Sequence, residues 1–136
     1  MAATRCLGLD IGDRKIGVAL SDPQGILASP LTIIKRIEEK LDIEAILGII
    51  DRNQVGQIIA GLPYNMDGSI GSQAEKVQAF VRALSSLTRV PVDFRDERLS
   101  TVSAKRLLRE VGKRKQTEDD AIAAALILQS YLDEER

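Results

Sequence analysis

Short apolar runs separated by turn-forming residues dominate the first quarter of the chain. They predict three strands, at residues 4–10, 15–21 and 26–34, and the turn formers between the first two strands indicate a hairpin. Pro30 has no backbone N–H to donate to a neighbouring strand. We therefore expect the third strand to lie at a sheet edge or to contain a bulge.

Helical and strand patterns alternate along the rest of the chain. Apolar residues at helical spacing predict helices over residues 38–53, 71–87, 100–111 and 118–133, with a buried strand at 57–62 and a short strand after Pro91. Residues 112–117 form a polar segment between the last two helices. This order is typical of an α/β fold in which an antiparallel three-strand start joins a mixed five-stranded sheet with helices packed on it. The length suits one domain over residues 1–136.

Composition excludes several kinds of catalytic site but does not identify a binding partner. The 19 basic and 20 acidic residues nearly cancel, so a nucleic-acid binder of this composition must gather its positive charge on one face. The absence of histidine excludes Ser-His and Cys-His nucleophile systems and most zinc sites. Hydrolysis would then depend on carboxylates, lysines, hydroxyls or a hard metal ion.

The single cysteine, Cys6, excludes an intrachain disulfide and fits a reducing compartment. No signal peptide precedes the first strand, and no apolar run reaches the roughly 18 residues that a bilayer requires. We therefore expect a cytoplasmic protein that does not associate with membranes.

Three acidic residues are placed where an α/β fold builds its sites. Asp10 ends the first predicted strand, Glu97 follows the strand after Pro91, and Asp120 lies at the start of the last predicted helix. Carboxylates that converge repel one another, and a cation stabilises such a cluster. Oxygen ligands select hard ions, so the expected cofactor is Mg²⁺ or Mn²⁺, and the expected chemistry is phosphodiester hydrolysis.

Basic and polar residues near these acids are candidates for binding nucleic acid. The densest basic stretch, residues 105–115, directly precedes Asp120 and carries one acid against six basic residues. Its charges can also form an ordinary solvated helix face. The candidates for phosphate or base contact are Arg14, Lys15, Asn65, Arg98, Lys105, Arg109, Lys113 and Arg114. Aromatic residues make up only 3% of the chain, so base stacking on aromatic rings is not expected to dominate.

Four motifs in order resemble the YqgF family, described as pre-16S rRNA nucleases and, in older usage, as Holliday junction resolvases. They are LGLDIGDRKIGVALSD, AGLPYNMDGS, DERLST and DDAIAAALILQSYL, and they extend from residue 7 to residue 132. The resemblance implies a ribonuclease-H-like fold, divalent metal and three catalytic, metal-binding acids at Asp10, Glu97 and Asp120. It also implies a role in maturation of the 5′ end of pre-16S rRNA, with precursor rRNA or ribosomal precursor particles as partners.

The sequence leaves several alternatives open. Asp119 neighbours Asp120 but points about 100° away around the helix, and a fourth ligand can come from Asp13, Asp22, Asp67 or Asp96. A Holliday junction resolvase acting on branched DNA and a non-catalytic RNA-binding assembly factor are the rival functions. A third rival is nucleotide binding, because DIG followed by a glycine-containing hairpin also resembles the phosphate loop of sugar kinases and actin-like ATPases. The sequence does not distinguish a monomer from a homodimer.

Overall fold

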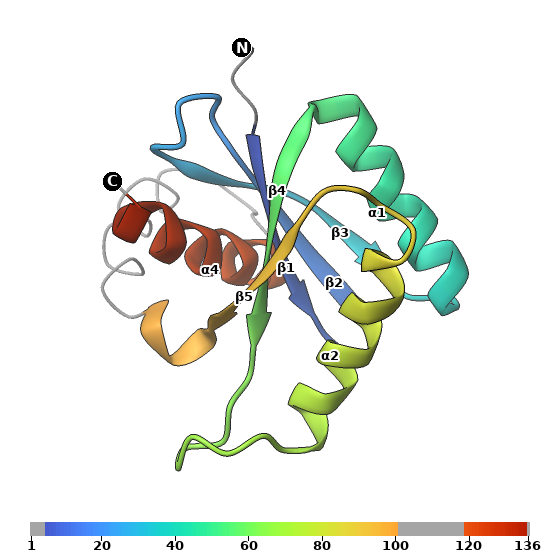
Figure 1. Cartoon of the computed structure of the whole chain (residues 1–136), viewed down its shortest axis with the longest axis vertical. Helices are drawn as coiled ribbons and strands as arrows, with labels where there is room; N and C mark the ends of the chain where they lie inside the picture. The colour runs from blue at the N-terminus through green and yellow to red at the C-terminus, as the bar shows by residue number, and fades with distance from the viewer. Residues whose placement is uncertain (1–4, 101–118, 136) are drawn as a thin grey trace.

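The computed structural model describes residues 5–100 and 119–135 (Figure 1). The elements are β1 (Arg5–Ile11), β2 (Lys15–Ser21), β3 (Ala28–Lys35), α1 (Glu39–Asn53), β4 (Val55–Leu62), α2 (Ser72–Ser85), β5 (Val92–Asp96), the 3-10 turn η1 (Glu97–Ser100) and α4 (Asp119–Glu135). The predicted helix at 100–111 and the polar segment at 112–117 fall outside the described residues, except that Ser100 ends η1.

The strands form one mixed five-stranded sheet in the order β3-β2-β1-β4-β5. β2 pairs antiparallel with β1 and with β3, whereas β4 runs parallel to β1 and to β5. The predicted hairpin and antiparallel three-strand start are therefore confirmed. β3 is an edge strand, and its register with β2 shifts near Pro30, so both consequences expected of that proline occur together.

Helices cover both faces of the sheet (Figure 1). α1 and α2 pack on one face over a large core, which receives Leu7 and Leu9 from β1. α4 packs on the other face over a smaller core of alanine, leucine and isoleucine. Because side chains alternate along a strand, Gly8 and Asp10 belong to the face that α4 covers.

Helix α4 approaches β1 closely because Gly8 has no side chain. A Cβ at this position would lie 2.8 Å from the Cβ of Leu128 and 2.9 Å from the carbonyl oxygen of Ala124. Any larger residue would therefore push α4 away from the sheet. This contact fixes the helix at a height where its first turn can approach the residues that follow Gly8 on β1.

Several predicted strand bounds were wrong by one or two residues, and β4, for example, begins at Val55 instead of residue 57. β1 continues to Ile11, so Asp10 is its penultimate residue instead of its last. β3 begins at Ala28 and not at residue 26, because the carboxylate of Asp22 accepts the backbone N–H groups of Ile26 and Leu27 and holds them in a turn. Side-chain acceptors of this kind compete with the strand ladder for backbone donors.

The far end of α4 is attached to the sheet by a fully buried glutamine. Oε1 of Gln129 accepts the N–H of Ala28 at 2.8 Å, and its Nε2 donates to the carbonyl oxygen of Ile26 at 2.9 Å. A buried polar group is tolerated where its hydrogen bonds are made. Gln129 thereby satisfies the backbone at the start of the edge strand β3.

Replacing Gln129 with leucine should lower the free energy of unfolding by about 1–3 kcal/mol, because the Ala28 N–H and the Ile26 carbonyl would lose their partner. Urea denaturation followed by circular dichroism measures this loss. Gln78→Leu, at a half-buried position on α2, is the matched control and should change stability by less. Equal stability of the Gln129 variant and wild type would contradict the structural role.

Candidate active site

Asp10 lies on β1, on the sheet face that α4 covers, opposite Gly17 of β2. Its neighbours Leu9 and Ile11 point into the core on the other face, and alternation therefore sets the direction of the Asp10 side chain. The residue is half-buried.

Glu97 can reach toward Asp10 because β4, the strand between β1 and β5, carries a glycine, Gly61, beneath the Glu97 side chain. A larger residue at this position would block the space. A Cβ on Gly61 would lie 3.0 Å from Cγ and 3.2 Å from Oε2 of Glu97. β4 lies between β1 and β5 in the sheet. Glu97 directly follows β5. Its carboxylate therefore lies over β4, on the side toward β1 and Asp10.

The electrostatics of Glu97 confirm that the two acids interact. Burial, repulsion by Asp10 and repulsion by Asp96 together raise the pKa of Glu97 to about 7, with burial the largest cause. A carboxyl that is half neutral near pH 7 has an environment unfavourable to its charge. Such perturbed acids are concentrated at functional sites.

The position of Asp120 is defined only by the backbone of α4. It is the second residue of the helix, and its side chain lies outside the described residues. Gln129 anchors the later turns of α4 beside Ala28, at the end of the sheet away from Asp10, so the helix begins toward the end that holds Asp10. Among the described residues, no group of three His, Cys, Asp or Glu side chains could hold a metal ion.

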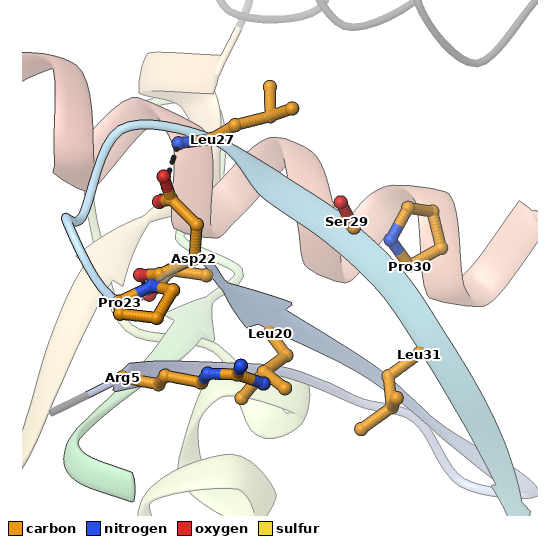
Figure 2. Close-up of a pocket in the computed structure, with 9 residues that line it drawn as sticks. Arg5, Leu20, Asp22, Pro23, Leu27, Ser29, Pro30 and Leu31 are labelled. Atoms are coloured by element: carbon orange, nitrogen blue, oxygen red, sulfur yellow. Dashed lines mark hydrogen bonds between the residues drawn. The ribbon is translucent and has the colours of Figure 1, made fainter. Parts of the chain in front are cut away.

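Of the possible fourth ligands, Asp22 lies at the wrong end of the sheet. It follows β2, which runs antiparallel to β1, and so stands beside Arg5, about five residues or 16 Å along the strand from Asp10. There it lines a hollow of about 320 Å³ and accepts the Leu27 N–H (Figure 2). Asp22 is therefore a turn ligand and not part of this site.

The other three acids have partners of their own. Asp13 forms an exposed ion pair with Lys76 at 3.5 Å, and Asp67 accepts the N–H and hydroxyl of Ser69. Asp96 pairs with Arg98, which lowers the pKa of Asp96. Of these three, only Asp96 contributes to the raised pKa of Glu97.

Arg98 connects the turn that holds Glu97 to the loop between β4 and α2. Its Nε lies 3.0 Å from both carboxylate oxygens of Asp96, and its guanidinium lies over the ring of Tyr64, 5.4 Å from the centroid. Nη1 also reaches the carbonyl oxygen of Met66 at 3.5 Å. These intramolecular contacts give Arg98 a bracing role that the sequence did not suggest.

Some of the remaining candidates for nucleic-acid contact lie within the described residues, and the others lie outside them. Arg14 is exposed on the β1–β2 turn and Lys15 is exposed at the start of β2, and Asn65 donates to the Ser69 hydroxyl within its own loop. The basic candidates Lys105, Arg109, Lys113 and Arg114 lie outside the described residues. For all of them, contact with nucleic acid stays a prediction.

Sequence reasoning missed Gly61, although a signal was present. A glycine inside a buried strand marks a place where another group approaches the backbone closely. At Gly61 two groups do so, since its Cβ would also lie 2.5 Å from Cδ1 of Ile127 on α4.

With this geometry established, a family model described as "RuvX: Holliday junction resolvase" matches residues 4–134. The chain belongs to this family. It is 48% identical over 136 residues to a "Putative pre-16S rRNA nuclease" of Thermoanaerobacter pseudethanolicus, covering 97% of this chain and 98% of the relative. A protein of the same name from Dehalococcoides mccartyi is 49% identical over 125 residues, covering 91% and 94%. The family expected from the four motifs is confirmed, and membership places the chain among the nucleases, which are hydrolases acting on ester bonds.

Solved structures confirm the ribonuclease-H-like fold. Thermus thermophilus RuvC, in complex with a Holliday junction substrate, aligns with a TM-score of 0.71 at 15% identity, covering 97% of this chain and 95% of RuvC. A Fowlpox virus resolvase, also with junction DNA, aligns with a TM-score of 0.59 at 14% identity, covering 97% and 99%. No helix among the described residues has the length and apolar character to cross a membrane.

Replacing Glu97 with glutamine should change how stability depends on pH. A carboxyl with a raised folded-state pKa contributes its stability below the unfolded value, near 4.5, and loses it as pH rises through about 7. In chelator at pH 8 we expect Glu97→Gln to be more stable than wild type by about 1 kcal/mol, a figure reduced for the partial exposure of the group.

Thermal melting at pH 5 and pH 8 measures this difference, which should shrink at the lower pH. Glu75→Gln, on the exposed side of α2, is the control and should show no such trend. A Glu97→Gln variant that melts below wild type at pH 8 would make Glu97 a structural acid.

Proposed function

We propose that this chain is a divalent-metal-dependent nuclease whose catalytic carboxylates are Asp10, Glu97 and Asp120. The observation that carries the proposal is the placement of the Glu97 carboxylate over Gly61, where burial and Asp10 raise its pKa to about 7. A fold gains no stability from bringing two acids together in this way. The arrangement is explained if the site exists to hold a positively charged group.

The donor set fits a hard cation such as Mg²⁺ or Mn²⁺. Asp10 and Glu97 offer only carboxylate oxygens, the ligands that these ions prefer, and we assign the third carboxylate to Asp120. The ion would supply charge neutralisation and Lewis acidity for phosphodiester hydrolysis. The protein contributes the placement of the acids on adjoining elements and an apolar neighbour, Ile127 of α4, beside Glu97.

Positive charge at the same end of the sheet supports a phosphate-bearing substrate. Arg14 is exposed on the β1–β2 turn, which directly follows the strand carrying Asp10, and Lys15 is exposed at the start of β2. Lys76, in the first turns of α2, reaches Asp13 of that same turn. Cationic groups beside an acidic site can attract the phosphate backbone before the metal ion is bound.

We propose precursor 16S rRNA, cut at or near its 5′ end, as the substrate class. The relatives at 48% and 49% identity are named putative pre-16S rRNA nucleases, which supports this choice. Our proposal places the reaction on ribosomal precursors in the cytoplasm. The second candidate is the four-way DNA junction, which the description of the family model supports. Resolution requires two symmetric cuts, and therefore two active sites related by a twofold axis.

Incubating labelled precursor rRNA and a four-way DNA junction with the protein tests both candidates. Cleavage should require Mg²⁺ or Mn²⁺ and stop in excess chelator, because the chain has no histidine to act instead. Asp120→Asn should remove nearly all cleavage, whereas Asp119→Asn should retain much of it, since the two side chains diverge by about 100° around the helix.

Three outcomes would count against this assignment. Cleavage that persists undiminished in chelator would exclude metal dependence. Equal loss in Asp119→Asn and Asp120→Asn would show that both residues bind metal or that the helical register was misread. Binding of rRNA without any cleavage in either metal would favour a non-catalytic assembly factor.

The basic stretch before Asp120 should bind the phosphate backbone. Changing Arg109, Lys113 and Arg114 together to alanine should weaken RNA binding and reduce the slope of log affinity against log salt by up to about three units. Filter binding over a salt series measures this slope. Arg82→Ala, on the last turn of α2, is the control, and an unchanged slope in the triple variant would make the stretch an ordinary solvated surface.

A further inference from the structure

Met66 is a large apolar side chain at the tip of the loop between β4 and α2, and it is 94% exposed. This loop projects from the body of the molecule at the end of β4 (Figure 1). Single exposed apolar residues are common on proteins, so exposure alone has no functional meaning. What distinguishes Met66 is that the backbone beneath it is held in place.

Hydrogen bonds on both sides of Met66 fix the loop. Asn65 and Ser69 bond through their backbones at 2.9 Å and through their side chains at 3.0 Å. Asp67 accepts the N–H of Ser69 at 2.9 Å and its hydroxyl at 2.6 Å, and the N–H of Gly68 donates to the Asn65 carbonyl at 2.8 Å. Polar partners therefore shape the loop without using the Met66 side chain.

The same loop is braced against the turn that carries Glu97. Arg98, the next residue after Glu97, lies over Tyr64 and reaches the Met66 carbonyl at 3.5 Å. Arg98 is itself held by Asp96. Arg98 therefore joins the tip of the loop to the turn that carries Glu97, and a nucleic-acid strand bound at Glu97 has this loop as a near neighbour.

We propose that Met66 is an apolar wedge that inserts between bases of the substrate next to the cleavage position. Apolar side chains, methionine among them, unstack base steps in this way, and the cost of unstacking is offset because the bent nucleic acid wraps more of the protein surface. A preorganised loop lowers the entropic cost of insertion. The inference rests on the proposed nuclease function and adds a substrate class to it.

That class is nucleic acid whose stacking is already weakened, such as a junction, a bulge, a frayed end or a single-stranded flank. Unstacking costs least at such places. Continuous duplex should therefore be bound through its phosphates but cut poorly. The loop has one aromatic residue, the half-buried Tyr64, and Arg98 lies over its ring, whereas Met66 is exposed. The loop therefore supports insertion of Met66 and not stacking of a base on a ring.

Fluorescence of 2-aminopurine tests the wedge directly. The probe is placed at the branch point of the four-way junction and at the 5′ end of 16S rRNA within its precursor, and emission is read on binding in chelator. Wild-type protein should raise emission, and Met66→Ala should reduce the rise roughly tenfold while Met66→Leu retains it. Met66 is so exposed that neither change should alter folding, which thermal melting checks. Leu87→Ala, another exposed apolar residue at the opposite end of α2, is the control.

Cleavage in Mg²⁺ is measured with the same variants. Met66→Ala should lose roughly tenfold in kcat/KM on substrates with unpaired nucleotides and change little on continuous duplex. If wild type cleaves and Met66→Ala matches it in both emission and kcat/KM, the wedge is wrong and the nuclease assignment stands. If wild type raises emission, Met66→Ala loses the rise and neither metal supports cleavage, the wedge stands and the nuclease assignment fails. If wild type neither raises emission nor cleaves, both are wrong.

Discussion

Helix α4 packs closely on the sheet because β1 and β4 each carry a glycine at the point of contact. Gly8 on β1 admits the Ala124 carbonyl and Leu128, and Gly61 on β4 admits Ile127. Because protein interiors are close-packed, an added methyl at Gly8 would displace the helix backbone, and one at Gly61 would displace the Ile127 and Glu97 side chains. The height of α4 above the sheet decides where its first turn lies relative to Asp10, so the candidate site depends on this close contact.

Gly61 links packing to electrostatics, because the space it leaves is shared by Ile127 and by the Glu97 carboxylate. An apolar side chain beside the acid lowers the local polarity and strengthens its repulsion from Asp10. The raised pKa of Glu97 is the physical sign of both effects. The fold therefore carries an unfavourable pair of acids, and binding of a cation to the native state would offset the cost.

The two ends of the sheet differ in the polar groups they hold. At the end near Arg5, the polar groups of Gln129, Ser21 and Asp22 all bond to backbone atoms and hold α4 and the edge strand together. At the end near Asp10, carboxylates from β1 and η1 repel each other. Loss of a polar group at the first end should lower stability, whereas loss of an acid at the second should alter cleavage and relieve repulsion in the native state.

The sequence by itself determined the alternation of strands and helices, the hairpin, and the edge position and bulge at Pro30, because these follow from local periodicity and backbone chemistry. It also marked Asp10 and Glu97 through their motifs. Only the tertiary structure decided that Glu97 reaches Asp10 over Gly61, that Asp22 stands at the wrong end, and that Arg98 braces the Met66 loop. Those facts depend on strand order and helix height, which arise from contacts between residues far apart in the chain and which no local pattern encodes.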